Sequence, residues 1–424
     1  MALMLALLTG QSVWADDGGS CGRSNVNNGN NVKWQYTEST GTLRIYPNTT
    51  DPSGDNFKTA QYTAFGHSPW YSYRANITKV IIENGIQSID NYFLDGCTAL
   101  TSDNITIPAS VTRIGSWVFR GCTSLTTAPI GSGVTDIAGN AFYQCTGLTT
   151  VNIPASVNDL IRNAFDRCSS LTDITVAAEN TTYKDEDGVL MSKDGTLLIK
   201  YPEGKTATSY TIPDGVTTIG DCAFENNTHL TAVTIPDDVT TIGSCAFSNC
   251  KELTSVTIPT SVTEINDMAF SLCPALTSVY LLSSTPPTLE EPYEHFIDVN
   301  VNCHFYHHGT AYNTNAGWLA MWDRMVNDPY VPDSEWTWTG THTVIGSVAL
   351  PTNVTAATAV LTYGTTKYYA EGATITLNHG AIPAGYTFGG YSVKDADNGD
   401  VTVTETSGVY TFVMPAKNVT VTVT

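Results

Sequence analysis

A phrase of eighteen residues returns along this chain at a fixed interval. It reads LTAVTIPDDVTTIGSCAF from Leu230 and LTSVTIPTSVTEINDMAF from Leu253, 23 residues later. The apolar positions align as I-x3-V-x2-I-x4-F-x2-C-x2-L-x2-V-x-I, and the phenylalanine position falls at Leu94, Phe119, Phe142, Phe165, Phe224, Phe247 and Phe270. Because a fixed period determines the architecture of a repeat protein, the pattern predicts a stack of similar coils.

Two intervals depart from this period. The first contains two extra residues, Ser102 and Asp103. The interval from Phe165 to Phe224 is 59 residues, which we interpret as one period plus an insertion of 36 residues between Val176 and Ile212. The conformational entropy lost by ordering one copy exceeds the free energy gained by burying its few apolar side chains. A single copy therefore cannot fold alone, and neighbouring copies must share a core.

Each copy contains three local patterns. LTSVTIP alternates apolar and polar residues and ends at a proline, which predicts a short strand. SVTEI predicts a second extended piece, and the apolar spacing of MAFSLCPAL is typical of a helical or 3₁₀ turn. The chain is therefore expected to form a β-rich solenoid of about seven repeats of 23 residues.

The full repeat, IPxxVTxIGxxAFxxCxxLTxVTIP, resembles the BspA-like leucine-rich repeat of bacterial surface proteins. It occurs from Ile107, Ile153, Ile212, Ile235 and Ile258, and the resemblance covers residues 77–283. VKWQYTESTGTLRIYP resembles the N-terminal cap of that family, and CHFYHHGTAYNTNAGWLAMW resembles its closing cap. The segment YKDEDGVLMSKDGTLLIKYPEGK is similar to its inserted hairpin, with turns expected at Asp187-Gly188 and Asp194-Gly195. Near the C-terminus, AGYTFGGYSV and FVMPAKNVTV resemble the divergent internalin B-repeat, a small all-β module.

These observations predict a domain order. The run MALMLALLTG, followed by Val13 and Ala15, is typical of a signal peptide and too short to span a bilayer. The predicted parts are a signal peptide (1–15), an N-terminal cap with a β-hairpin (16–76), a leucine-rich repeat solenoid (77–283) with a hairpin insertion (about 177–211), a closing cap (284–328), a linker (329–341) and an all-β B-repeat-like module (342–424). The protein is therefore expected to be secreted or held at the cell surface.

The composition excludes some classes of function. Charged residues make up only 14 % of the chain, and the formal net charge is −21. So acidic a surface repels a phosphate backbone, which argues against nucleic-acid binding. We find no nucleophile elbow, phosphate-binding glycine loop, zinc-helix motif or carboxylate pair, so the sequence predicts neither an enzyme nor a cofactor.

The ten cysteines follow the repeat. Six occupy one repeat position and predict a structural column of buried small side chains: Cys97, Cys122, Cys145, Cys168, Cys250 and Cys273, with Asn227 in the seventh copy. Cys222 and Cys245 share another position, where either free thiols or a disulfide would fit. No cysteine spacing matches a zinc site, so no metal is predicted.

Three other motifs have a structural and a functional interpretation. The histidines of CHFYHHG (residues 303–309) would divide between two faces of a strand, which favours a cap over a metal site. DEDG (185–188) and DADNGD (395–400) are typical of turns and lack the spacing of a calcium loop. Trp336 and Trp338 would either stack on a sugar or anchor a domain junction, and we favour the junction.

The candidate contact surface is the outward column of residues just before the last apolar position of each TIP strand. Its members offer hydroxyl and amide groups with little acid–base capacity: Thr106, Asn152, Thr175, Thr211, Thr234, Thr257 and Tyr280. The expected function is a non-enzymatic adhesion scaffold that binds protein partners on host or microbial surfaces. The alternatives are a carbohydrate-binding component of a surface glycan system, and an enzyme with a site in the N-terminal cap or the insertion.

Overall fold

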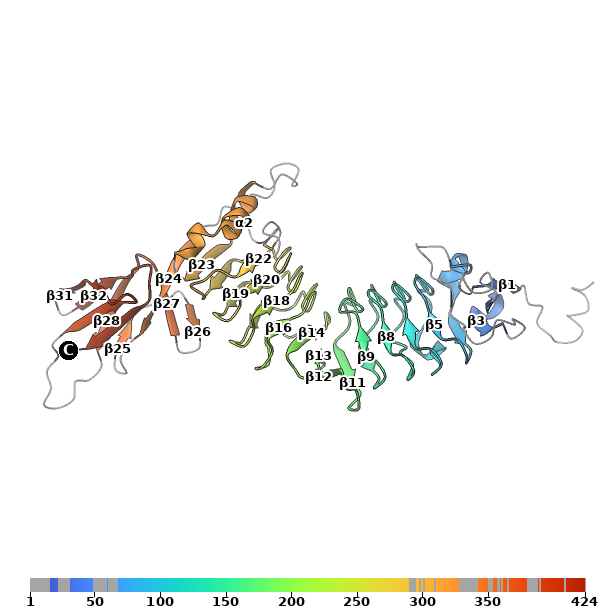
Figure 1. Ribbon diagram of the computed structural model, residues 1–424. Coiled ribbons are helices and arrows are strands. Elements are labelled where there is room, and N and C mark those ends of the chain that lie inside the picture. Colours follow the sequence, from blue (N-terminus) through green and yellow to red (C-terminus); the bar gives the residue numbers. More distant parts are fainter. Residues whose placement is uncertain are drawn as a thin grey trace, which may run out of the picture. The chain divides into compact units, whose positions relative to one another are not determined.

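The computed structural model describes residues 16–21, 31–48, 59, 68–289, 295–296, 299, 302–308, 310–327, 342–349, 354–356, 359, 361–363, 366–379, 388, 390–407 and 409–423. They belong to two compact units, which we describe separately. The N-terminal unit runs to Thr206 and includes Ile219–Thr228, and the C-terminal unit comprises Ala207–Thr218 and His229–Thr424. Figure 1 shows the short strands of successive coils side by side. The predicted signal peptide and linker lie outside the described residues.

An antiparallel sheet begins the N-terminal unit. β2 (Val32–Thr37) pairs with β1 (Asp16–Ser20) and β3 (Thr42–Pro47), and β3 then pairs in parallel with β4 (Lys79–Ile82). β4 is followed in the sheet by β6 (Ile105–Thr106). The hairpin thus covers the first coil and begins its column of parallel strands. Three short 3₁₀ helices accompany these strands: η2 (Glu38–Thr40), η3 (Tyr71–Asn76) and η4 (Ser102–Asn104).

Each regular coil contributes one strand to each of two sheets. We call the sheet formed by the TIP segments the strand column. Its further members in this unit are β9 (Thr150–Ile153) and β11 (Asp173–Val176), which pair in parallel and in register. The second sheet contains β5 (Ser88–Ile89), β7 (Arg113–Ile114), β8 (Asp136–Ile137) and β10 (Asp159–Leu160), also parallel.

The insertion forms a three-stranded meander, β12 (Tyr183–Glu186), β13 (Val189–Ser192) and β14 (Leu197–Lys200). Asp187 and Gly188 form its first turn with φ of 50° and 74°, the left-handed pair that a two-residue hairpin turn requires. After β14, Tyr201 stacks on Phe224 with ring centroids 5.2 Å apart. Tyr201 therefore occupies the phenylalanine position of a coil, so this segment is not a simple insertion between two coils.

The segment around each phenylalanine is a series of turns with 3₁₀-type hydrogen bonds, one of the two predicted forms, and not a continuous helix. Cys122 N–H bonds Phe119 C=O and Leu125 N–H bonds Cys122 C=O, which are 3₁₀-type contacts. In most coils a residue with φ near +60° stands on either side of the phenylalanine, for example Trp117 and Gly121 around Phe119, whereas Phe165 has one only on its C-terminal side, at Arg167. These left-handed residues prevent the turns from joining into a helix. N–H groups that do not bond within the turns donate to the next coil, as Phe119 N–H does to Ala141 C=O.

Stacked aromatic rings fill the coils. Phe142 lies between Phe119 and Phe165, with centroid distances of 5.0 and 5.3 Å. The six predicted column cysteines are all buried. The thiols of Cys122, Cys145, Cys168 and Cys273 donate to a carbonyl of the preceding coil, as from Cys145 to Phe119 at 3.0 Å. Asn227 likewise donates from Nδ2 to Pro202 C=O at 3.4 Å. The column therefore combines apolar packing with weak hydrogen bonds. All ten cysteines are free thiols.

The coils of the C-terminal unit likewise contribute strands to a strand column and to a second sheet. Its strand column contains β15 (Ser209–Thr211), β17 (Ala232–Thr234), β19 (Ser255–Ile258), β21 (Ser278–Leu281) and β23 (His304–His308), each parallel to the next. Its second sheet contains β18 (Thr241–Ile242), β20 (Glu264–Ile265) and β22 (Thr288–Leu289). β16 (Thr218–Ile219) contains the boundary between the two units.

The closing segment packs against the last rings of this unit. Phe270 stacks between Phe247 and Phe296, and Trp318 covers Phe296 at 6.4 Å. Trp318 belongs to α2 (Ala316–Asn327), which follows the short η5 (Ala311–Thr314). The fully buried indole donates its Nε1–H to Pro287 C=O at 2.9 Å. These contacts close the apolar end of the coil stack.

The strand column extends into the C-terminal all-β segment. β24 (His342–Ala349) pairs in parallel with β23 and in antiparallel with β27 (Thr366–Ala370). The remaining strands are β25 (Val354–Ala356), β26 (Leu361–Tyr363), β28 (Thr374–His379), β29 (Tyr391–Asp395), β30 (Asp400–Val401), β31 (Val403–Thr406), β32 (Val409–Val413) and β33 (Val419–Val423). They surround a small core that includes Tyr369, Phe412 and Val421.

Candidate binding face

The predicted contact residues all lie in the strand column, three in one unit and four in the other. Thr106, Asn152 and Thr175 belong to β6, β9 and β11 of the N-terminal unit. Thr211, Thr234, Thr257 and Tyr280 belong to β15, β17, β19 and β21 of the C-terminal unit. The side chains are exposed or half-buried, because each alternates with inward apolar neighbours.

Asn152 and Thr175 are brought together. They are register partners in β9 and β11, and Thr175 Oγ1 donates to Asn152 Oδ1 at 2.5 Å. The amide group of Asn152 is thereby oriented with its Nδ2 group away from the threonine. Thr106 is not part of this pair, because the coil between β6 and β9 contributes no strand of its own to the column.

We call residues 126–134 of this coil the irregular segment. It makes a single bridge to β9, between Thr127 and Thr150. Its first N–H groups, of Thr126 and Thr127, donate to Ser102 Oγ at 2.9 Å instead of to backbone carbonyls. Ser102 is one of the two extra residues of the first interval, so an insertion in one coil alters the start of the next.

Two features of the sequence explain why the irregular segment leaves the column. Pro129 stands in a strand position and has no N–H to donate to a ladder. Gly131 replaces the usual proline, and a Cβ there would lie 2.5 Å from Ile107 C=O; a Cβ at Gly133 would lie 1.9 Å from Ala109 C=O. Only glycine allows this close approach, so the segment lies against the preceding coil and away from β9.

A hollow of about 340 Å³ lies between the irregular segment and β9–β11. Its apolar lining includes Ile130, Ile153 and Val176, and its polar lining comes from Ser132, Asn152 and Thr175. The far wall is fixed by the inserted meander, where Asp185 Oδ1 accepts the N–H of Val176 at 2.7 Å. A concave surface with an apolar floor and a few placed polar groups is the usual form of a binding site.

The other end of the predicted column has a different surrounding. Tyr280 stacks on Tyr306 of β23 with centroids 4.8 Å apart. Both rings pack against a small cluster formed by Leu282 and Tyr368 of β27. The C-terminal all-β segment therefore covers this end of the strand column, and Tyr280 is less available than the threonines before it.

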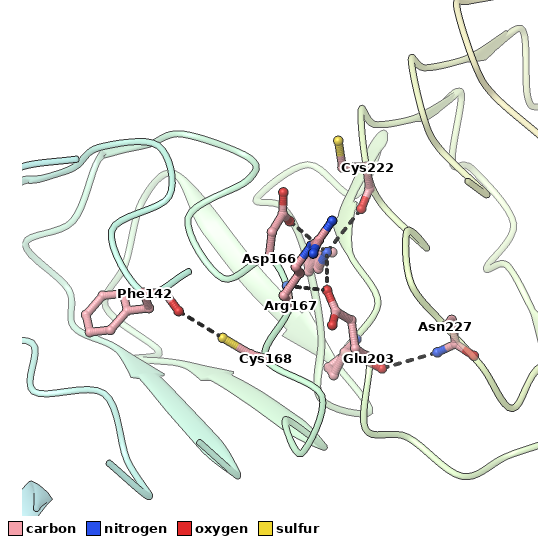
Figure 2. Close-up of polar contacts among 9 residues, drawn as sticks. Phe142, Asp166, Arg167, Cys168, Glu203, Cys222 and Asn227 are labelled. Atoms are coloured by element: carbon pink, nitrogen blue, oxygen red, sulfur yellow. Dashed lines mark hydrogen bonds and ion pairs between the residues drawn. The ribbon is translucent and has the colours of Figure 1, made fainter. Parts of the chain in front are cut away.

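A buried charged cluster lies at the base of the inserted meander (Figure 2). Lys200 is 1 % exposed, and its Nζ contacts Asp166 Oδ1 at 3.0 Å, Glu203 Oε1 at 3.4 Å and Cys222 C=O at 3.2 Å. Glu203 also accepts the N–H of Arg167 at 2.8 Å. Asp166, Glu203 and Cys222 belong to separate stretches of the unit, so the ammonium group joins the meander to the coils on both sides.

The charged groups in this cluster shift one another's pKa values. Burial by itself would lower the pKa of Lys200, but Asp166 and Glu203 together raise it above its usual range. Burial raises the pKa of Glu203 against the attraction of Lys200, and it also raises the pKa of Glu225 nearby. The buried ammonium thus compensates the two carboxylates that it contacts, and its loss would leave them unpaired in the interior.

The cluster also contains ligand-type atoms. Those of Asp166, Cys222 and Glu225 lie within 4.8 Å of one another. The ammonium of Lys200 already supplies the positive charge beside Asp166, so we assign this group a structural role and no metal.

The other candidate motifs are found in separate surroundings. His307 is buried against Trp322 and Tyr312, whereas His304 and His308 lie on the opposite face of β23. Asp395 accepts the N–H groups of Asp397 and Gly399 in a turn. Trp336 and Trp338 lie outside the described residues.

Sequence reasoning missed the interruption of the strand column and the charged cluster. The signal for the first was present: Pro129 occupies a position that is Thr or Asn in most copies. The signal for the second was a lysine in the apolar run LLIKYP, at an inward position two residues after Leu198.

The in-register parallel coils with two sheets and a shared aromatic core define a leucine-rich repeat solenoid. More particularly, the repeat region of this chain belongs to the BspA-type leucine-rich repeat family. The family description "BspA type Leucine rich repeat region" matches residues 66–186 and 203–292 in six copies. The predicted fold class is thus confirmed. The match ends before the C-terminal segment, so its resemblance to the B-repeat stays a prediction.

The comparison with solved structures found similar proteins, one of them with a TM-score above 0.5. A leucine-rich repeat protein from Eubacterium ventriosum is 25 % identical with a TM-score of 0.55, over 70 % of this chain and 80 % of that chain. A leucine rich cell surface protein from Faecalibacterium prausnitzii is 22 % identical with a TM-score of 0.41, over 69 % of this chain and 96 % of that chain. The comparison with curated proteins found no match. Within the described residues, no helix has the length and hydrophobicity needed to cross a lipid bilayer.

Proposed function

We propose that this protein is an exported, non-enzymatic scaffold on a bacterial surface, which binds proteins of host or microbial surfaces through its strand column. The observation that carries the proposal is the hollow beside Asn152 and Thr175, at the interruption of the strand column between β6 and β9; the predicted contact residues of the column offer hydroxyl and amide side chains. A leucine-rich repeat solenoid is a rigid platform with little chemistry of its own, and the membership in the BspA-type family supports a binding role.

Electrostatics support the same class of partner. A net charge of −21 with few charged residues gives a surface that repels anionic polymers. The polar groups of the hollow are neutral, so recognition there depends on hydrogen bonds and apolar contact. Such contacts are weak one at a time and become strong when many molecules act together on a surface.

The test is capture by the full chain coated at high density. Host matrix proteins and bacterial cells are passed over the coat, and a glycan array is probed in parallel for the carbohydrate alternative. The double variant Asn152→Ala/Thr175→Ala should lose most of the capture. The matched control Asn158→Ala/Thr146→Ala, which changes exposed side chains outside the hollow, should retain it. Failure of the native chain to capture any protein or cell at high density would contradict the proposal.

A further inference from the structure

The hollow beside β9 leaves one rung of a β-ladder open. In parallel strands, alternate residues direct both their N–H and their C=O to the same neighbour. Thr150 directs both to the irregular segment, since its N–H bonds Thr126 C=O at 3.3 Å and its C=O accepts from Ala128 N–H at 3.4 Å. Asn152, two residues later, directs its backbone groups to the same side.

The regular coils show how this rung is normally filled. In the C-terminal unit, Ile212 N–H donates to the C=O of Thr234 at 3.1 Å. Ile130 and Asn152 are the residues at the same two positions. Ile130 N–H instead donates to Ala128 C=O at 3.0 Å, within its own segment. Ala128 and Ile130 thus satisfy each other, and within the described stretch 68–289 no backbone group on this side pairs with the N–H or C=O of Asn152.

The geometry points to a specific ligand class: we propose that the hollow binds an extended peptide segment, which pairs with Asn152 as the missing strand would. This inference rests on the proposed function and names the partner's chemistry. An extended peptide offers a C=O and an N–H two residues apart on one side, which is the spacing that Ala128 and Ile130 would have supplied. An N-acetyl sugar offers a single trans amide, whose N–H and C=O point in opposite directions and cannot reach both groups.

The lining fits such a segment. The hollow's volume of about 340 Å³ is within the range of roughly 300–1,000 Å³ that ligand pockets have, so it admits a short stretch of extended chain. Ile130 and Val176 are half-buried and accept an aliphatic side chain, while Ser132 and the Nδ2 group of Asn152 lie at the polar border. An unpaired strand edge is a template for a strand of another chain.

The probe is the strand that regular coils place in this position. Ser255–Ile258 reads SVTI, and the test uses this tetrapeptide acetylated and methyl-amidated at its ends. Amide hydrogen exchange of the full chain measures directly whether the N–H of Asn152 is hydrogen-bonded. In the free protein, the amide of Asn152 should exchange quickly and that of Val151, which faces β11, slowly. Saturating peptide should slow Asn152 by about tenfold, equivalent to about 1.4 kcal/mol.

Two controls define the contact. A peptide N-methylated at isoleucine lacks the N–H that would donate to Asn152 C=O and should lose the effect. The variant Pro129→Thr/Gly131→Pro restores the regular sequence of the coil, so it should fill the hollow, protect Asn152 without peptide and bind none. If this variant fails to fold, the N-methylated peptide on the native chain still decides the question.

The outcomes separate the two proposals. Two results together would overturn the peptide inference and leave the scaffold function standing. The variant Pro129→Thr/Gly131→Pro would still capture cells or proteins, and the peptide would not protect Asn152 in the native chain. Peptide protection without any surface capture would do the reverse. Equal protection of Asn152 by a chitin trisaccharide would overturn the assignment to peptides.

Discussion

The two units of this protein build the same strand column in different ways. In the C-terminal unit, β15, β17, β19, β21 and β23 pair one after another and continue into β24. In the N-terminal unit the column ends at β6 and resumes at β9, with one isolated bridge between the irregular segment and β9. The second sheet runs from β5 to β10 across the same place without a gap. A coil can therefore lose one of its strands while the other strand and the core remain in register.

The largest effect is expected where the N-terminal unit departs most from its repeat. Lys200→Met removes the ammonium that pairs with Asp166 and Glu203 and leaves these buried carboxylates uncompensated. We expect a loss of about 3–5 kcal/mol in the free energy of unfolding, measured by urea denaturation. Lys193→Met, at an exposed lysine of the same meander, should change little.

The pH dependence of this effect follows from the pKa of Lys200. A lysine whose pKa is raised in the folded state stabilises fully below its unfolded pKa and loses this contribution only as the pH rises through the folded pKa. An unfolded lysine titrates near pH ~10.4, so the difference between the two proteins should persist from neutral pH to about pH 9. A difference that disappeared in this window would mean that Lys200 is not paired as described.

The aromatic core should be equally strong in both units. Phe142 and Phe270 each lie between two stacked rings. Replacement of either by alanine should cost about 3–5 kcal/mol, because each leaves a cavity between two coils. A cost for Phe142→Ala much below that for Phe270→Ala would show that the interruption of the strand column extends into the core.

Thiol reactivity should divide the cysteines by burial and not by unit. Cys222 and Cys245 are half-exposed, one in each unit, and the other eight are buried. Burial raises the pKa of Cys145 and of Cys273 to about 12, which suppresses the reactive thiolate. Maleimide should therefore label two sites quickly in the folded protein, identified by mass spectrometry, and ten after unfolding. Rapid labelling of a column cysteine would indicate that its coil opens.

The smallest effect concerns the exposed end of the meander. Hydrogen bonds from Ser192 and Thr196 lower the pKa of Asp194 to about 2. A lowered carboxyl pKa stabilises the fold above the unfolded value and ceases to do so as the pH falls through about 2. Ser192→Ala should raise this pKa toward ~3.9, measured by the NMR shift of the carboxyl carbon. A pKa unchanged by Ser192→Ala would show that the turn is held by other groups.

The repeat predicted the core well because inward positions are fixed by period. Phe119, Phe142 and Phe165 stack as their 23-residue spacing requires, and the Asp187-Gly188 turn lies where its sequence placed it. The turns around each phenylalanine were less predictable, since apolar spacing says nothing of φ at Trp117 or Gly121. In that segment, residues in the left-handed region interrupt the helix, and backbone N–H groups are paired with carbonyl groups of the next coil.

The site was harder to predict because it depends on contacts between coils. Pro129 showed that a strand was doubtful, but the hollow also requires the close approach of Gly131 to Ile107 C=O and the N–H contacts of Ser102. Neither contact follows from one copy taken by itself. The contacts of Lys200 with Asp166 and Cys222 were likewise unpredictable, because these two residues belong to other coils, whereas Glu203 follows Lys200 by three residues.

The pairing of β24 with β23 has a mechanical consequence. The two strands are parallel, so a pull between the chain that enters β23 and the chain that leaves β24 acts along the strands in opposite directions. Their ladder bonds then bear the load together and must rupture at once, instead of opening singly from one end. A molecule held in flowing fluid would resist detachment of its final segment for that reason.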